Sequence, residues 1–122
     1  MEVVNVKVKS IRPKYDNLEK WMKDENNVYI GRRGIVFIKN ENGQKERFPK
    51  VDSIWHNPFK IKGDMTREDV ILKYKEYIED KLKNDESLRE SLVKLKGKKL
   101  GCWCKPEKCH GDVLIELIER LV

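Results

Sequence analysis

The chain opens with hydrophobic residues that alternate with polar ones. Valines at positions 4, 6 and 8 are separated by polar residues, which predicts a half-buried strand over 2–9 that Pro13 ends. A second strand is expected at 28–30. A last strand is expected over 98–104, with Leu100, Cys102 and Cys104 on one of its faces.

A hairpin signal follows the second strand. The apolar run 35–38 and the segment 44–48 flank an Asn42-Gly43 pair. An Asn-Gly pair between two strand-like runs predicts a β-hairpin. The segment 53–63 is aromatic and contains Pro58, but it is neither helical nor alternating, so a structured loop is expected there.

Hydrophobic residues recur at helical spacing in four further segments, namely 16–25, 66–83, 85–96 and 113–121. Asp16 is the expected cap of the first helix and Thr66 the cap of the second. Gly97 is expected to end the third. Strands mixed with long helices predict an α/β fold with a partly parallel sheet of about four strands flanked by helices, the hairpin being an insertion.

Composition limits the class of protein. With 122 residues the chain has the length of one domain, expected to span 1–122, and 39% hydrophobic residues suffice for a core. No apolar run approaches the length of a membrane span, so no membrane is expected as a partner. The start of the chain lacks the pattern of a signal peptide, which makes the cytoplasm the expected location. Three cysteines within eight residues are therefore expected to be reduced thiols.

The densest chemistry lies between the last predicted strand and the last helix. Cys109, His110 and Asp112 would stand at the start of that helix, where backbone N–H groups bind anions and favour a thiolate. They are the candidate catalytic residues, with Gly111 as a ligand-binding residue. Cys102 would contribute to the same pocket.

Three interpretations of these cysteines are open. The first is a zinc site, for which Cys102, Cys104, Cys109 and His110 are the alternative metal ligands, although their spacing departs from the paired spacing of structural zinc sites. The second is a pocket with a reactive or ligand-contacting thiol. The third is plain core packing, since cysteines are often buried.

Two other segments supply candidate ligand-binding residues. Gly31 and Arg32 follow a predicted strand, where an arginine can hold a phosphate or carboxylate with two bonds. The alternative is a tight turn followed by a solvated arginine. His56 and Asn57 lie beside Trp55, and together they could contact a nucleobase, unless the aromatic rings only fill the core.

The net charge of +6 favours an anionic partner. Six lysines and only one acidic residue lie within 94–108, and such a patch attracts nucleic acid. The candidate nucleic-acid-binding residues are Lys98, Lys99, Lys105 and Lys108. A solvated surface is the alternative.

Four motifs follow one another along the chain: Tyr29-Ile30-Gly31-Arg32, His56-Asn57-Pro58-Phe59, Thr66-Arg67-Glu68 with Tyr74, and Leu100-Gly101-Cys102-Trp103-Cys104 leading to Cys109-His110-Gly111-Asp112. In this order they resemble the domain-of-unknown-function family DUF4326, from about Val28 to Leu121. The resemblance implies relatives in bacteria, phages and other viruses, and it implies no activity. The hairpin around 40–43 departs from the family pattern as an insertion.

These observations lead to three hypotheses. The first is a pocket that binds, and could process, a nucleotide, a nucleobase-bearing metabolite or a nucleic-acid end. The second is a non-enzymatic nucleic-acid-binding module that uses the lysines. The third is a protein-interaction module stabilised by zinc, of the kind that serves as an accessory protein of a phage or virus.

Overall fold

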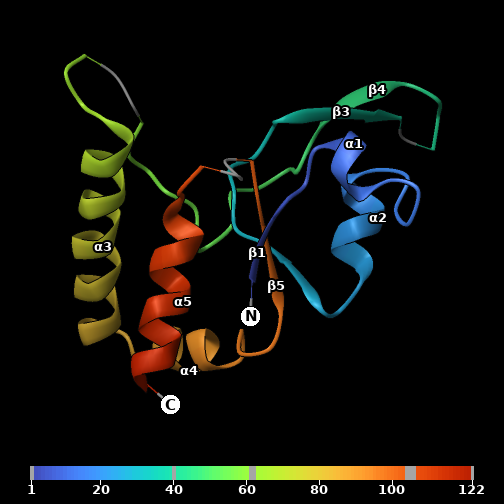
Figure 1. Cartoon of the computed structure of the whole chain (residues 1–122). Coiled ribbons are helices and arrows are strands. Elements are labelled where there is room, and N and C mark those ends of the chain that lie inside the picture. Colours follow the sequence, from blue (N-terminus) through green and yellow to red (C-terminus); the bar gives the residue numbers. More distant parts are fainter. Residues whose placement is uncertain (1, 40, 61–62, 104–106, 122) are drawn as a thin grey trace.

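The computed structural model describes residues 2–39, 41–60, 63–103 and 107–121, with residue 121 described by its backbone alone. It has a mixed α/β fold, as the sequence predicts, with a parallel sheet between two layers of helices (Figure 1). Five strands are described. Three form the parallel sheet and two form a separate antiparallel hairpin.

The parallel sheet has the order β1-β5-β2, so the strand that comes last in the sequence lies in the middle. The strands are β1 (Glu2–Asn5), β5 (Lys99–Cys102) and β2 (Asn27–Tyr29). Leu100 pairs with Val3 on one side and with Val28 on the other. The carboxyl ends of all three strands therefore meet at one edge of the sheet.

The hairpin is β3 (Val36–Lys39) and β4 (Lys45–Phe48). Val36 pairs with Phe48 in antiparallel register. Gly43 has φ +77°, the left-handed backbone that a tight turn requires and that glycine adopts without strain. The hairpin predicted from Asn42-Gly43 is thus confirmed.

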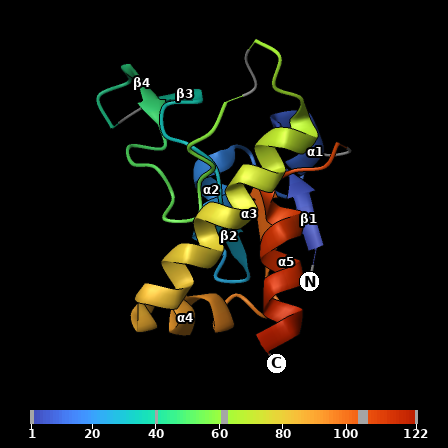
Figure 2. The ribbon, with the colours of Figure 1, turned by 90° about the vertical axis from the view of Figure 1, so that its left-hand side faces the viewer.

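Three helices cover one face of the sheet and two short ones cover the other. α3 (Arg67–Asn84), α4 (Glu86–Val93) and α5 (His110–Leu121) enclose the larger core with Leu100, Leu114 and Ile118. α1 (Val8–Ile11) and α2 (Leu18–Lys23) enclose a smaller one around Trp21. Figure 2 shows α3 and α5 side by side over the larger core.

Local signals explain the long helix α3. Thr66 accepts a hydrogen bond from the backbone N–H of Asp69, and the Asp69 carboxylate accepts one from the backbone N–H of Thr66. This reciprocal capping box fixes the start of α3. Apolar side chains at every fourth position, with Tyr74 and Ile78 at its centre, then bury one face.

Two glycines allow elements to approach closely. A Cβ on Gly101 would lie 2.4 Å from Cη2 of Trp21, and a Cβ on Gly111 would lie 2.7 Å from Cγ2 of Val3. Gly101 thus admits the Trp21 ring from α2 against β5. Gly111 brings the first turn of α5 down onto the sheet.

Several predicted boundaries were wrong. The first strand ends at Asn5 instead of continuing to residue 9, because the Asn5 side chain accepts a hydrogen bond from the backbone N–H of Lys7 and turns the chain into α1. Asn17, not Asp16, caps α2 by accepting from Lys20. The last strand ends at Cys102, and Cys104 lies outside the described residues.

The helices of the described chain are too short or too polar to cross a membrane. The longest, α3, carries charged residues along most of its exposed face.

Candidate functional site

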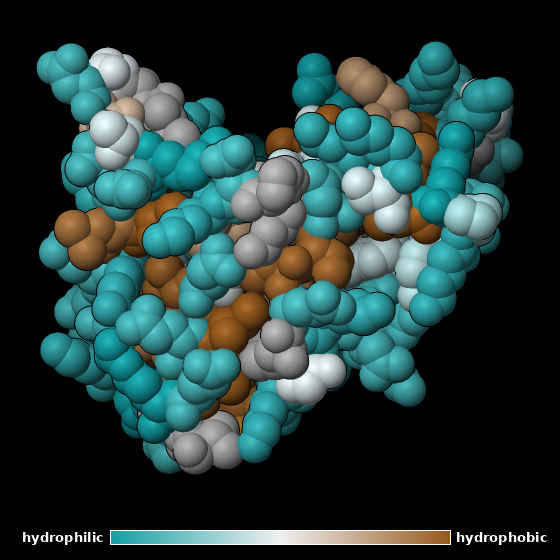
Figure 3. All heavy atoms as spheres, in the orientation of Figure 1, coloured by the Kyte–Doolittle hydropathy of each residue, from teal (hydrophilic) through white to brown (hydrophobic). Residues whose placement is uncertain are grey.

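A cavity of about 500 Å³ lies at the sheet edge where β2 and β5 end. The first turns of α3 and α5 and the loop that follows Trp55 complete its wall. Figure 3 shows the surface hollowed between the loop before α3 and the hairpin. The residues that line the cavity are Gly31, Arg32, Ile35, Asn57, Phe59, Lys60, Arg67, Val70, Ile71, Cys102, Trp103, Lys108, Cys109 and His110.

Among the described residues, the charged side chains of the wall are all positive. Arg32, Lys60, Arg67 and Lys108 line the cavity, and no aspartate or glutamate belongs to its lining in the described part of the chain. A guanidinium N–H of Arg67 lies 3.4 Å from the carbonyl oxygen of Lys108, so the start of α3 contacts the segment before α5. Concave walls of one charge sign concentrate the opposite charge, so the potential in the cavity is favourable to anions.

Arg32 also holds the loop that contains Asn57 and Phe59. Its Nε and Nη2 donate to the carbonyl oxygen of Asn57 at 2.9 and 2.6 Å, and Nη2 donates to that of Phe59 at 2.9 Å. The Asn57 side chain accepts from the backbone N–H of Phe59, which closes the turn. Part of the Arg32 fork is therefore committed to the loop, and Arg32 also belongs to the lining of the cavity.

Tyr29 holds the backbone of Arg32 in place. Its hydroxyl donates to the carbonyl oxygen of Arg32 at 2.7 Å and accepts from Nε1 of Trp103 at 2.9 Å. Burial raises the pKa of Tyr29 to about 12, although the bond from Trp103 acts in the opposite direction. The hydroxyl thus stays protonated and keeps donating at physiological pH.

Cys109 caps α5. The backbone N–H of Gly111 donates to the Cys109 sulfur at 3.3 Å, and the Asp112 carboxylate accepts from the backbone N–H of Cys109 at 3.0 Å. These bonds resemble a capping box, except that the Cys109 sulfur accepts from Gly111, the second helical residue, while the carboxylate belongs to Asp112, the third. Gly111 and Asp112 do not line the cavity. Their hydrogen bonds hold Cys109, which does line it.

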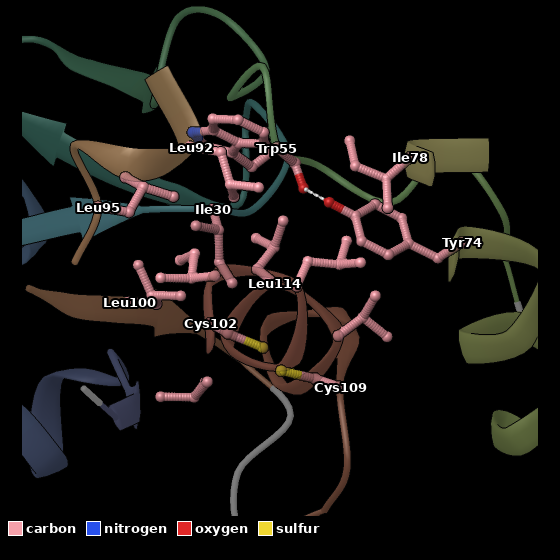
Figure 4. Packing of buried hydrophobic residues seen from close by; sticks show 14 of the residues in the cluster. Ile30, Trp55, Tyr74, Ile78, Leu92, Leu95, Leu100, Cys102, Cys109 and Leu114 are labelled. Atoms are coloured by element: carbon pink, nitrogen blue, oxygen red, sulfur yellow. Dashed lines mark hydrogen bonds between the residues drawn. The ribbon is translucent and has the colours of Figure 1, made fainter. Parts of the chain in front are cut away.

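Cys102, Cys109 and His110 form a compact group in the cavity wall. One donor atom of each lies within 4.8 Å of the others, and all three residues are buried. In Figure 4 the sulfurs of Cys102 and Cys109 point toward one another. This group could hold a metal ion. Cys104, the fourth ligand of the sequence-based alternative, lies outside the described residues.

Two neighbours hold the His110 ring. Nε2 lies 2.6 Å from the carbonyl oxygen of Ile30, which can only accept, so Nε2 carries the proton and in the neutral ring Nδ1 carries the lone pair. Tyr74 packs edge-on against the imidazole, with centroids 4.9 Å apart. The Tyr74 hydroxyl donates to the carbonyl oxygen of Trp55 (Figure 4), and burial raises the pKa of that hydroxyl well above 10.0.

Some predicted site residues lie elsewhere. The His56 ring bonds to the carbonyl oxygen of Ser53 and lines a different hollow, beside Asp52 and Asp80. Lys98 and Lys99 lie at the amino end of β5, away from the cavity, so they do not form one patch with Lys108. Lys105 lies outside the described residues.

The sequence analysis missed the part that α3 plays in the wall. Arg67, Val70 and Ile71 line the cavity with Lys60 and Ile35. Arg67 follows the Thr66 cap directly, which placed it in a first helical turn. Nothing in the sequence indicated that this turn faces the start of α5.

Comparisons with known proteins agree with the sequence motifs. A family model described as "Domain of unknown function (DUF4326)" matches residues 14–120. An uncharacterized 12.4 kDa protein from the nrdA-td intergenic region of Enterobacteria phage T4 is 38% identical over 56 residues, covering 46% of this chain and 52% of its own. The uncharacterized protein R718 of Acanthamoeba polyphaga mimivirus is 40% identical over 78 residues, covering 57% of this chain and 56% of its own.

The matched segments thus span about half the length of these curated relatives. No solved structure matches the chain.

Proposed function

The chain belongs to the DUF4326 family, and from the geometry of its cavity we propose that it binds a nucleotide or the phosphorylated end of a nucleic acid. The observation that supports this most is the lining of the cavity, in which four cationic side chains stand without a carboxylate among the described residues. The phosphate would lie toward Arg67 and Lys108, at the amino end of α5, where the helix dipole favours an anion.

The remainder of the wall suits a nucleobase. Trp103 and Phe59 offer aromatic surface, and Ile35, Val70 and Ile71 offer aliphatic surface. Aromatic side chains stack on bases with little regard to sequence. A volume of about 500 Å³ also lies within the range of small-ligand sites, about 300–1,000 Å³.

The test compares adenosine 5′-monophosphate, adenosine and inorganic phosphate by calorimetric titration. We expect the nucleotide to bind more tightly than either part of it. Lys108→Gln should weaken nucleotide binding by about 1 kcal/mol, close to fivefold. Lys94→Gln is the matched control, because it removes the same charge from an exposed lysine outside the cavity lining.

Equal affinities for adenosine and its monophosphate would contradict the proposal, as would a complete lack of nucleotide binding. Titration with a 5′-phosphorylated oligonucleotide and with its 5′-hydroxyl form tests whether the ligand is a free nucleotide or the phosphorylated end of a nucleic acid. If the two oligonucleotides bind alike and binding falls steeply with salt, the lysine-dependent nucleic-acid-binding module is favoured instead.

The thiol–imidazole group supports a second candidate function, the binding of zinc. Two cysteines and a histidine are donors that zinc prefers, and here one atom of each lies within 4.8 Å of the others. Elemental analysis of protein purified without added metal should find about one zinc per chain. Protein without bound metal that also fails to take up added zinc would exclude this candidate. Cys102 and Cys109 are reduced thiols in the structure, and this supports the cytoplasm as the proposed location.

A further inference from the structure

We propose that the metal ion bound by Cys102, Cys109 and His110 keeps one coordination position open toward the cavity, and that the phosphate group of the ligand binds to the metal there. This inference rests on both parts of the proposed function. It adds that the two sites are one, so that metal and anion increase each other's affinity.

The three ligand residues all belong to the lining of the cavity. Cys102 and Cys109 are each 2% exposed and His110 is 8% exposed, yet all three line the cavity. Their backbones belong to β5 and to the start of α5, and these elements pack against the core. A fourth ligand therefore reaches the group from the cavity.

The donor atoms are held in place by their surroundings. The Ile30 carbonyl holds the His110 ring through Nε2, so Nδ1 is the ring nitrogen that would bind the metal. The N–H of Gly111 bonds to the sulfur of Cys109. Metal-binding histidines usually donate their other ring N–H to a carbonyl or carboxylate, and such outer bonds orient the ligands.

The types of donor also suit an open site. Within the described ranges, the group contains three ligand residues and no fourth histidine, cysteine, aspartate or glutamate. Structural zinc sites use four protein ligands, whereas sites with two cysteines and one histidine keep a fourth position for water or substrate.

Charge favours an anion in that position. Zn²⁺ with two thiolates and a neutral imidazole has no net charge, so it does not offset the four cations of the wall. A phosphate oxygen at the metal would stand in the cavity that Arg67 and Lys108 line. Metal coordination and cationic contacts would thus act on the same phosphate group.

The experiment uses Co²⁺ as a spectroscopic substitute for zinc in the full chain. Protein freed of metal by a chelator is loaded with one equivalent of Co²⁺, and its visible ligand-field bands are recorded during titration with adenosine 5′-monophosphate. We expect the bands to change with saturation at one nucleotide per metal. We also expect the nucleotide to bind about fivefold or more tightly to Zn²⁺-loaded than to metal-free protein, as linkage requires for coupled sites.

The outcomes distinguish a failure of this inference from a failure of the zinc candidate or of the nucleotide function. If nucleotide binds equally with and without metal and leaves the bands unchanged, the inference is wrong and the proposed function stands. If Co²⁺ and Zn²⁺ do not bind, the inference and the zinc candidate fall together. If no nucleotide binds to either form, the proposed nucleotide function itself is wrong.

Cys104→Ser tests for a closed site. If Cys104 were the fourth ligand, its loss would weaken Co²⁺ binding and alter the bands before any nucleotide is added, and the inference would be overturned. An open site predicts a variant whose metal affinity, bands and response to nucleotide match those of the wild type.

Discussion

Cys109 does for α5 what serine, threonine or aspartate does for most helices. Its sulfur accepts the N–H of Gly111, and the Asp112 carboxylate accepts the N–H of Cys109. A residue singled out for its reactivity is thus also part of the local structure. A loss of function in a Cys109 variant must therefore be separated from a loss of stability.

Two substitutions at Cys109 make that separation. Serine can still accept a hydrogen bond from Gly111, whereas alanine cannot. The free energy of unfolding of Cys109→Ser should therefore exceed that of Cys109→Ala by about 1 kcal/mol. Chemical denaturation in the presence of a chelator measures this without a contribution from metal. Equal stabilities would show that the sulfur does not cap α5, while loss of Co²⁺ binding in both variants would report on the sulfur as a ligand.

Gly111 matters because it has no side chain, so the prediction here is that adding one destabilises the protein. A Cβ there would meet Cγ2 of Val3 at 2.7 Å and Cδ1 of Ile30 at 2.8 Å. Gly111→Ala should destabilise the protein by about 1–3 kcal/mol, although alanine is the better helix former by about 1 kcal/mol.

Thermal unfolding of Gly111→Ala beside Ser87→Ala, an exposed position of α4, gives the comparison. If both variants gain stability, α5 has room to move away from the sheet at no cost.

At the scale of the element, the capping box of α3 predicts a dependence of stability on pH. Hydrogen bonds from the backbone and side chain of Thr66 lower the pKa of Asp69 below its ordinary value of 3.8. A carboxyl group whose pKa is lower in the folded state stabilises that state above the unfolded pKa and loses this effect as pH falls through the folded pKa.

Asp69→Asn should therefore have a lower melting temperature than the wild type at neutral pH, and this difference should shrink as pH falls below 3.8. Melting curves of both proteins by circular dichroism, recorded from neutral pH downward, measure the difference. A gap that stays constant down to acid pH would mean that the charge of Asp69 does not contribute.

Elements with strong local signals were the ones that the sequence predicted well. The hairpin depends on Asn42-Gly43 and α3 on Thr66 and its apolar stripe, and both formed as expected. The first strand was predicted too long, because the valines continue to alternate through Val8 while the side chain of Asn5 turns the backbone. A single side-chain hydrogen bond outweighed the pattern.

The cavity was harder to predict than the elements around it. Arg67 and Lys108 meet although 41 residues separate them, and their meeting depends on how α3 packs beside α5. His56 shows the reverse case, since its neighbour Asn57 lines the cavity and His56 does not. Sequence patterns assign residues to helices, strands and loops. Which residues line the same cavity depends on how those elements pack.

At the scale of the whole molecule, the net charge of +6 and the cationic cavity predict a dependence on salt. Raising the salt concentration shortens the range of charge interactions to below about 10 Å, so nucleotide binding should weaken. The slope of log affinity against log salt should be shallower for Arg67→Gln and shallower again when Lys108→Gln is added.

Calorimetric titrations at several KCl concentrations measure these slopes, with Lys94→Gln as the control that keeps the wild-type slope. Identical slopes in all variants would place the bound phosphate away from Arg67 and Lys108.

The order of strands in the sheet has a consequence for synthesis of the chain. β1 and β2 are translated early, yet in the described part of the chain each pairs with β5 and not with the other. Both must wait for Lys99–Cys102 to leave the ribosome before either has a hydrogen-bonded neighbour. Such distant pairing slows folding and leaves apolar strands exposed meanwhile. A chain released before β5 is translated would have neither the parallel sheet nor the cavity at its edge, and we expect chaperones and proteases to recognise it.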